Sequence, residues 1–395
     1  MNFNIVESFL VILLLALAVT VVFRYVQIPI VLGYVLVGVV VGPHVLSWLP
    51  NTKIVKDFAE FGVVLLMFTV GLNFSLPKLF SLRHAVFILG GLQVLFSIII
   101  TAILGILLGM SVIASVVVGS VVAMSSTAIV IKQLSDQLEL NTQHGANAIG
   151  ILLFQDLAVT PILVFIASMT ATSAHPFWIT LLWSFVKGIL AILIILGLGR
   201  WILKPLFRLI AATRTIELFT LSVLFVAVGA AWLTNTLGLS YALGSFLAGI
   251  MLAECEYRHQ IKIEIRPFRD VLLALFFISI GMLVNITTWP QTWSWILLLV
   301  VGLMLGKPLL IILLNRLSKY NFPTATRTGL ILAQGGEFGF AILTLALTNQ
   351  LLPTDWGQSV LAALLISFVF APIIIRYNKN IAKFLLPKKI KKNLI

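Results

Sequence analysis

Long apolar runs separated by short polar stretches recur along the whole chain. A helix needs roughly 20 apolar residues to cross a bilayer, and fewer where it is broken. The pattern therefore predicts an all-α polytopic membrane protein with about thirteen transmembrane helices. We expect spans near these residues: 5–23, 28–43, 56–73, 84–109, 112–133, 147–170, 178–200, 216–235, 239–254, 267–285, 293–314, 326–348 and 358–377.

The composition supports the membrane class. Of the 395 residues, 61% are hydrophobic and only 10% are charged, whereas a soluble domain carries about 25% charged residues. The apolar run at 9–23 lacks the basic start and the small-residue cleavage site of a signal peptide, so we interpret it as the first span. The single cysteine, Cys255, excludes an intrachain disulfide and a cysteine-rich metal site.

The basic residues predict the orientation of the chain. The net charge is +13, and 22 of the 26 Lys and Arg residues fall in one set of loops and in the C-terminal tail. The opposite loops hold Lys53 and Lys56, and Lys187 and Lys307 lie in or near spans. Because cytoplasmic loops are enriched in Lys and Arg, we expect the N-terminus outside and the C-terminus in the cytoplasm. The basic tail then meets anionic membrane lipid rather than nucleic acid.

Two spans carry polar interruptions at corresponding places. The fifth span holds three consecutive hydroxyl residues within 123–128, and the twelfth holds a pair of glycines within 333–339. Glycine weakens a helix, and polar side chains can satisfy the backbone groups that an unwound turn frees. The residues concerned are Ser125, Ser126, Thr127, Gln334, Gly335, Gly336 and Glu337.

These interruptions suggest two copies of one six-helix unit. If spans 1–6 and 8–13 are repeats joined by span 7, each break falls in the fifth helix of its repeat, and the second repeat is inverted in the membrane. Paired breaks of this kind point to the binding site of a secondary transporter. The partial charges at half-helix ends suit ion coordination. The alternative is close helix packing through small residues.

Asp156 is the residue with the clearest functional implication. It lies within 150–163, in an apolar stretch long enough to cross a bilayer. An ionised carboxylate there costs about 2.5–3.5 kcal/mol on insertion scales, so such a group usually titrates, binds a cation or lines a wet cavity. The alternative is a carboxyl held in a structural hydrogen-bond network. We expect Asp156 to bind a cation and a proton in turn.

Three further residues are candidates for the same site. Gln155 offers an amide oxygen as a cation ligand. Lys307 lies in an apolar span without an acidic neighbour in sequence, so Asp156 is its expected partner. Either an arriving cation displaces Lys307, or Asp156 alone exchanges a proton for the cation and Lys307 is structural; the sequence leaves both open. Glu337 is either a site ligand or a cap on a half-helix.

Enzyme chemistry is not expected of this chain. No His/Cys cluster, nucleotide-binding glycine loop or nucleophile elbow accompanies the intramembrane carboxylate. We therefore expect no catalytic residues and no cofactor, and only the transported ions as ligands. The rival classes are a cation channel or uniporter, and a receptor or scaffold without transport.

At these motifs the chain resembles the Kef-type branch of the monovalent cation:proton antiporters. The resemblance covers nearly the whole chain. The segments that carry it are 58–68, 125–128, 150–161 with its Gln155–Asp156 pair, 242–254 followed by 256–259, and 334–338.

The resemblance implies a sodium/proton antiporter-like fold, with two inverted repeats and broken crossing helices. It implies a homodimer in a bacterial inner membrane that exchanges K+ or Na+ for H+ by an elevator-type movement. Within a transport domain at 1–377, spans 1–3 and 8–10 would form the dimerisation part, spans 4–6 and 11–13 the ion-binding core, and span 7 the linker. By motif, Asp156 is the ion and proton carrier, Gln155 its neighbour and Lys307 the core lysine.

The resemblance also carries one departure. Kef-type proteins usually continue into a cytosolic nucleotide-binding regulatory domain, which we expect to be absent or truncated here because 378–395 is only a basic cytoplasmic tail. The Gln155–Asp156 pair, in place of paired acids, favours K+ by resemblance. A Na+/H+ antiporter of the same fold and a ligand-gated K+ efflux channel-like protein stay open as alternatives.

Overall fold

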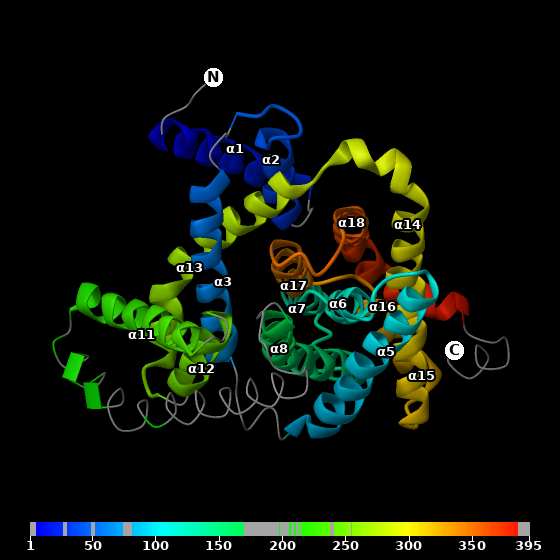
Figure 1. Ribbon diagram of the computed structural model, residues 1–395. Coiled ribbons are helices and arrows are strands. Elements are labelled where there is room, and N and C mark those ends of the chain that lie inside the picture. Colours follow the sequence, from blue (N-terminus) through cyan, green and yellow to red (C-terminus); the bar gives the residue numbers. More distant parts are fainter. Residues whose placement is uncertain are drawn as a thin grey trace. The chain divides into compact units, whose positions relative to one another are not determined.

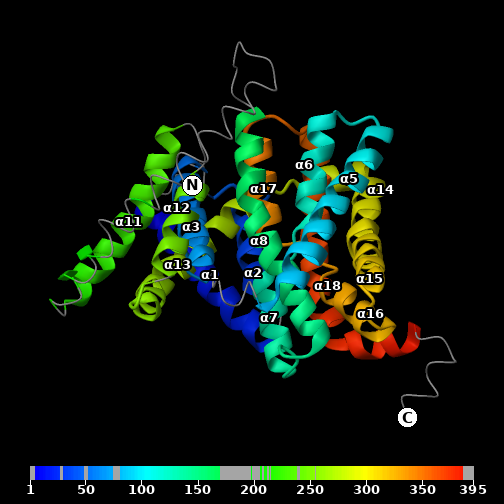
Figure 2. The same cartoon turned by 90° about the horizontal axis from the view of Figure 1, so that it is seen from below.

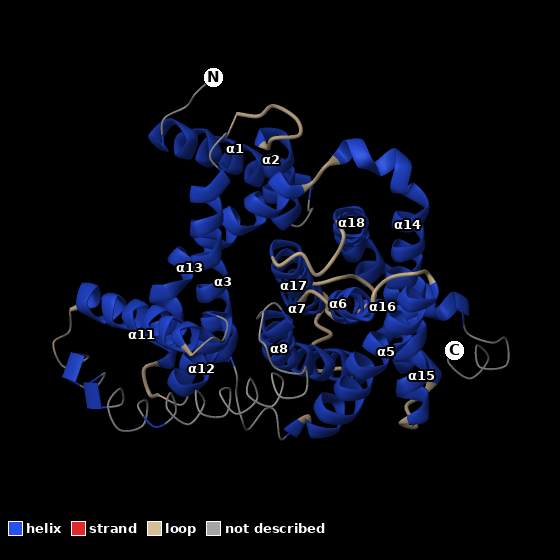
Figure 3. Cartoon of the chain, in the orientation of Figure 1, coloured by secondary structure: helices blue, strands red, loops and turns tan. Residues whose placement is uncertain are grey.

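The computed structural model describes residues 5–26, 30–48, 52–73, 81–169, 197, 205–206, 209–210, 213, 215–237, 241–253 and 255–385. Within these ranges the chain is helical, with loops and turns but no strand (Figure 3). Six of the described helices are long and apolar enough to cross a membrane, and five apolar helices are shorter. Each expected span has a helix or a broken pair of helices as its counterpart, except 178–200, which apart from residue 197 lies outside the described residues.

The chain divides into two compact units. The first comprises residues 1–16, 34–77 and 160–283, and the second comprises 17–33, 78–159 and 284–395. Two helices near the N-terminus, α1 (Ile5–Val26) and α2 (Ile30–Val41), each contribute to both units. The second unit holds most of the residues expected in spans 4–6 and 11–13, but the roles of ion-binding core and dimerisation part stay predictions.

The first unit is built on α3 (Thr52–Asn73), α11 (Ile216–Thr236), α12 (Tyr241–Ala253) and α13 (Arg258–Leu283). Figure 1 shows α3 crossing next to α12 and α13. Two glycines allow this close approach, since a methyl group added to Gly249 would lie 2.9 Å from the Cα atom of Gly71 and would meet the Phe68 carbonyl. Apolar side chains including Phe68, Phe219 and Leu252 fill the space between these helices.

The second unit begins with a π-helical turn, η1 (His84–Gly90), which leads into α5 (Gly91–Leu107). The broken pair α6 (Val112–Ala123) and α7 (Thr127–Asp136) follows, and then α8 (Gln143–Met169), which contains Pro161. Figure 2 shows α5 and α6 side by side.

A similar series recurs near the C-terminus. After the short η3 (Ile286–Thr288) and α14 (Trp289–Val301), the π-helical turn η4 (Gly302–Gly306) leads into α15 (Lys307–Leu317). The broken pair α16 (Phe322–Ile331) and α17 (Glu337–Thr348) follows, and then α18 (Thr354–Leu385), which contains Pro372. Both series therefore run from a π-helical turn to a broken helix to a long helix with an internal proline, as two repeats would.

The half-helices that precede the breaks also begin alike. Ser111 accepts a hydrogen bond from the Ala114 amide at the start of α6, and Asn321 accepts one from the Thr324 amide at the start of α16. Side-chain caps of this kind satisfy amides that have no partner in the first turn. Neither α6 nor α16 ends at a proline, so polar groups from neighbouring helices must hold the unwound segments that follow.

Candidate ion-binding site

The first break comprises Met124, Ser125 and Ser126, whose backbone is extended at Met124 and Ser126. The Ser125 amide donates to the Gln155 side-chain oxygen over 2.8 Å, and the Ser125 hydroxyl donates to the Leu332 carbonyl over 3.1 Å. Ser126 begins α7 as its N-cap, because its hydroxyl accepts from the Ile129 amide. The backbone groups that the break frees are thus bonded to side chains, as a membrane interior requires.

Two glutamines form the support of this break. The Gln155 side-chain nitrogen donates to the Gln93 side-chain oxygen over 2.7 Å, and the Gln93 nitrogen donates to the Ala123 carbonyl over 3.1 Å and to the Ser97 hydroxyl over 3.0 Å. Both glutamines are fully buried. In this conformation, the Gln155 side-chain oxygen accepts a hydrogen bond from the backbone of the break, so it is not a cation ligand without another partner.

The second break comprises residues 332–336. The Gly335 amide donates to the Ser367 hydroxyl over 3.0 Å, and this hydroxyl donates in turn to the Leu364 carbonyl. A methyl group added to Gly336 would lie 2.7 Å from the carbonyl carbon and oxygen of Ser125. Only glycine fits this position, and the two breaks therefore meet at Gly336.

Lys307 joins the two breaks. Its ammonium group donates to the Met124 carbonyl over 2.6 Å and to the Gln334 carbonyl over 3.1 Å, and the side chain is only 3% exposed. Both carbonyls follow the C-terminal ends of half-helices, where a positive charge is favoured. The expected ion pair with Asp156 is not found among the described residues. Carbonyl oxygens of the unwound segments take the place that we expected a carboxylate to fill.

Asp156 reaches the start of α7 from α8. One of its carboxylate oxygens accepts a hydrogen bond from the Thr127 hydroxyl over 3.1 Å. Asp156, Thr127 and Glu337 are partly exposed, whereas Ser125, Ser126, Gln155, Lys307 and Gln334 are buried. The structure therefore brings the expected site residues together but divides them into an accessible group and a buried support.

Glu337 is the first residue of α17, yet it also contacts the start of α7. Its carboxyl group lies close to the Ser126 hydroxyl and to the backbone amides of Ala128 and of Glu337 itself. An acidic side chain is favoured at a helix N-terminus, and this one lies at the start of both second half-helices. The sequence left a capping role and a ligand role open for Glu337, and both stay predictions.

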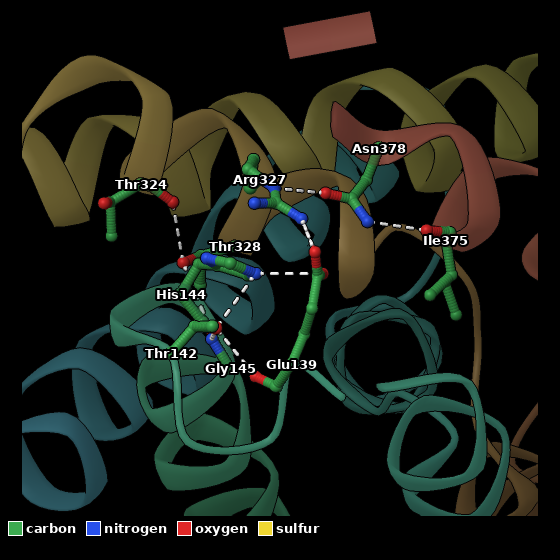
Figure 4. A network of polar contacts seen from close by, with 9 residues as sticks. All are labelled: Glu139, Thr142, His144, Gly145, Thr324, Arg327, Thr328, Ile375 and Asn378. Carbon is green, nitrogen blue, oxygen red and sulfur yellow. Dashed lines mark hydrogen bonds and ion pairs between the residues drawn. The ribbon is translucent and has the colours of Figure 1, made fainter. Parts of the chain in front are cut away.

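A second polar cluster, absent from the sequence-based expectations, lies at the other end of α7 and α16 (Figure 4). The Arg327 guanidinium donates to both carboxylate oxygens of Glu139 at 2.5 and 2.6 Å, and to the Asn378 side-chain oxygen. The His144 ring lies 3.1 Å from Glu139. Although burial opposes ionisation, Arg327 and His144 hold the pKa of Glu139 below its usual range. In the sequence, the only indication of this ion pair is that Glu139 and Arg327 are charged residues near the ends of apolar spans.

The comparisons with known proteins bear on the same segments. The family model described as sodium/hydrogen exchanger, transmembrane, matches residues 10–377. The chain belongs to this family. It is similar to "Putative K(+) efflux antiporter KefB" of Alkalimonas amylolytica, with 39% identity over 368 residues. That match covers 93% of this chain and 56% of the relative, so the exchanger-family chain described here spans little more than half the relative's length.

Solved structures confirm the fold class. The sodium proton antiporter MjNhaP1 from Methanocaldococcus jannaschii, determined at pH 8, matches with a TM-score of 0.69 over 94% of this chain and 96% of its own, at 15% identity. An electron microscopy structure of the same antiporter gives a TM-score of 0.68 over 98% and 99%, at 17% identity. At such identities the likeness concerns the fold alone. This exchanger-family chain is a multi-pass membrane protein.

Proposed function

We propose that the chain is the transmembrane part of a secondary antiporter that exchanges a monovalent cation for H+, with Asp156 as the alternating carrier. The observation that carries this proposal is a partly exposed carboxylate beside the meeting point of two broken helices. One of its oxygens accepts from Thr127, and the carboxylate can take either a proton or a cation. Because one negative charge serves both ions, they compete, and competition couples their fluxes.

The position of Lys307 supports one of the two exchange schemes. Its ammonium group is bonded to Met124 and Gln334 carbonyls, so a cation can reach Asp156 without displacing it. We therefore favour the scheme in which Asp156 alone exchanges a proton for a cation and Lys307 holds the two breaks together. Gln155 and Ser125 are part of the same support, and Thr127 is the hydroxyl that contacts the carrier.

The cation, the movement and the assembly are further parts of the proposal. The name of the KefB relative and the Gln155–Asp156 pair favour K+, with Na+ as the alternative. We propose a homodimer in a bacterial inner membrane, with the N-terminus outside, in which the second unit moves as an elevator. We also propose that a cytosolic regulatory domain acts on this transport domain, either as a separate partner or as a continuation of the C-terminus. The alternative class is a ligand-gated K+ efflux channel-like protein.

The test is exchange in proteoliposomes with an imposed pH gradient. Adding K+ or Na+ collapses the gradient in vesicles with the wild-type chain, and vesicles with Asp156→Asn behave like empty ones. Asp355→Asn is the matched control, because Asp355 is exposed at the start of α18 and keeps wild-type exchange. Equal exchange by wild type and Asp156→Asn contradicts the carrier assignment. Cation flux that is fast and independent of the pH gradient favours the channel class.

The cation is identified in the same vesicles. K+, Na+, Li+ and Rb+ are added in turn, with and without a membrane potential. A response to K+ and Rb+ with little response to Na+ and Li+ supports the K+ assignment, and the reverse order supports the sodium alternative. A rate that changes with the potential shows that unequal charges are exchanged.

A further inference from the structure

The helix α18 is longer than a bilayer requires. It has 32 residues, from Thr354 to Leu385, whereas roughly 20 residues cross the hydrocarbon core. Pro372 lies inside the helix, where a proline removes one helical hydrogen bond and bends the axis. Figure 2 shows the last turns of α18, in red, running across the direction of α5 and α14. The segment after Pro372 can therefore lie along the membrane surface.

One face of this segment is fixed on the protein. It is formed by buried residues three or four positions apart, namely Ala371, Ile375, Asn378 and Ala382. The Asn378 side-chain oxygen accepts a hydrogen bond from the Arg327 guanidinium of α16, and its nitrogen donates to the Ile375 carbonyl over 2.6 Å (Figure 4). Because this face is held, the directions of the other faces are determined as well.

The second face is basic. Arg376, Lys379 and Lys383 are three and four positions apart, so they share one face of the helix, and all three are exposed. None of the ion pairs among the described residues involves them. Cations near the C-terminal end of a helix are favoured by its dipole, which is the simplest explanation of this face. That explanation does not account for the apolar face beside it.

The third face is apolar although it is exposed. Ile373 is 53%, Tyr377 49% and Phe384 81% exposed, at positions four and seven apart. This face continues an exposed apolar surface that begins before the proline, where Phe370 is 48% exposed. The Arg376 guanidinium carbon lies 6.0 Å from the centre of the Tyr377 ring, so the basic and apolar faces adjoin. Adjacent basic and aromatic faces are typical of a helix between lipid headgroups and acyl chains.

We propose that the segment 373–385 of α18 is a binding site for the headgroups of anionic lipids. The basic face contacts the phosphate oxygens, and the apolar face enters the boundary of the acyl chains. Charge complementarity identifies this occupant, because every charged residue of the segment is basic and the surface of an anionic membrane is negative. The sequence predicted lipid contact for the basic tail as a whole, whereas this site consists of two defined faces of one helix. It does not depend on the exchange proposed at Asp156.

The test is lipid binding by the full chain in neutral detergent. Phosphatidylglycerol, which is anionic, and phosphatidylcholine with the same acyl chains are titrated, and the unfolding midpoint is measured. We expect phosphatidylglycerol to raise the midpoint at the lower concentration. A variant that combines Arg376→Gln, Lys379→Gln and Lys383→Gln should need a concentration more than about tenfold higher, since each basic residue near an anionic surface contributes about fivefold. Equal responses of the wild type to the two lipids would overturn the proposal.

A charge-matched control separates this site from the overall positive charge of the chain. It combines Lys132→Gln, Arg266→Gln and Lys319→Gln, at exposed positions outside α18. We expect it to keep most of the response to phosphatidylglycerol, and equal losses in the two triple variants would contradict a site on α18. Midpoints without added lipid show whether each variant is folded. If the first triple variant does not fold, Lys383→Gln alone should raise the required concentration about fivefold, and an unchanged concentration speaks against the site.

The apolar face and the source of the phosphate are tested separately. Tyr377→Ser combined with Phe384→Ser keeps the charges, and we expect a weaker response to phosphatidylglycerol that still declines as salt is added. Glycerol phosphate, which is the headgroup without acyl chains, should leave the midpoint unchanged at the same concentrations. An unchanged response of the double variant, or a response to glycerol phosphate equal to that to the lipid, shows that the site binds phosphate and not a lipid.

Discussion

The two breaks occupy corresponding places, but different chemistry holds them. Lys307 donates to a carbonyl of each break, but the other support differs: Met124–Ser126 is held by the neutral amides of Gln93 and Gln155, and the break at 332–336 by the Ser367 hydroxyl. Gln155 and Ser367 have the same task, since each accepts from a backbone amide of its break. A break at the same place in each repeat therefore determines which backbone groups need a hydrogen-bond partner, but different side chains can provide that partner.

The charged residues are what make the two breaks one site. Lys307 contacts a carbonyl of each break at the C-terminal ends of α6 and α16. Glu337 contacts the N-terminal ends of α7 and α17. One lysine and one acidic residue therefore lie at the four half-helix ends, and Asp156 is the remaining acidic residue, which we propose as the carrier.

Removing Lys307 is the strongest way to break this arrangement. Lys307→Met keeps the length of the side chain but leaves the Met124 and Gln334 carbonyls without their donor, at a cost of about 2–4 kcal/mol in the free energy of unfolding. The measurement is the thermal unfolding midpoint in detergent. Lys379→Met, at an exposed position on α18, is the control and leaves the midpoint unchanged.

The same variant tests the ion pair that the structure lacks. If Lys307 served Asp156, then Asp156→Asn would already have lost most of that stabilisation, and adding Lys307→Met would cost little more. We expect instead that Lys307→Met destabilises the wild type and Asp156→Asn by similar amounts. A double variant no less stable than Asp156→Asn alone would favour the ion pair.

The meeting of the breaks at Gly336 can be tested with adjacent glycines. A methyl group at Gly336 meets the Ser125 backbone, whereas one at Gly335 meets the tip of the Leu364 side chain, which can turn away. We expect Gly336→Ala to lower stability by about 1–3 kcal/mol through overpacking, and Gly335→Ala to have the smaller effect. Unfolding midpoints and exchange rates of both variants provide the check. Equal effects would mean that the backbone contact between the breaks is not important.

The amide support of the first break is the next target. Gln93→Leu leaves the Ala123 carbonyl unbonded and Gln155→Leu leaves the Ser125 amide unbonded, so we expect each to cost about 1–3 kcal/mol. The two glutamines also bond to each other, and the double variant should therefore cost less than the sum. Gln291→Leu, at an exposed position on α14, is the control. Additive losses would show that the glutamines act independently.

Hydropathy predicted the spans and the two breaks because a membrane helix must be apolar and must satisfy its own backbone. The same argument singled out Asp156 and Lys307. The predicted partner of Lys307 was wrong. We had assumed that a buried lysine pairs with an acidic side chain, but the carbonyls of an unwound helix can also accept its hydrogen bonds. Gln93 and Ser367 were missed because a neutral buried residue carries no charge signal, although a lone glutamine in an apolar span is visible in the sequence.

The smallest expected effect is that of removing the ion pair between Glu139 and Arg327, which lies away from the two breaks. Glu139 follows α7 and Arg327 lies in α16, 188 residues apart in sequence, so their ion pair joins the first broken helix to the second away from the ion site. Arg327 and His144 hold the pKa of Glu139 below its usual value of 4.5 despite its burial. A carboxyl with a lowered pKa stabilises the folded state above that usual value, and this contribution is lost as the pH falls through the folded-state pKa.

The unfolding midpoint of the wild-type chain should therefore fall as the pH drops below about 4.5, and Glu139→Gln should weaken this dependence. Glu217→Gln, at an exposed position on α11, is the control and should keep the wild-type slope. Because the pair lies at the opposite end of α7 from Asp156, we expect Glu139→Gln to leave the cation concentration for half-maximal exchange unchanged at neutral pH. A change in that concentration would mean that the two broken helices communicate along their length, and not only where Lys307 and Glu337 join them.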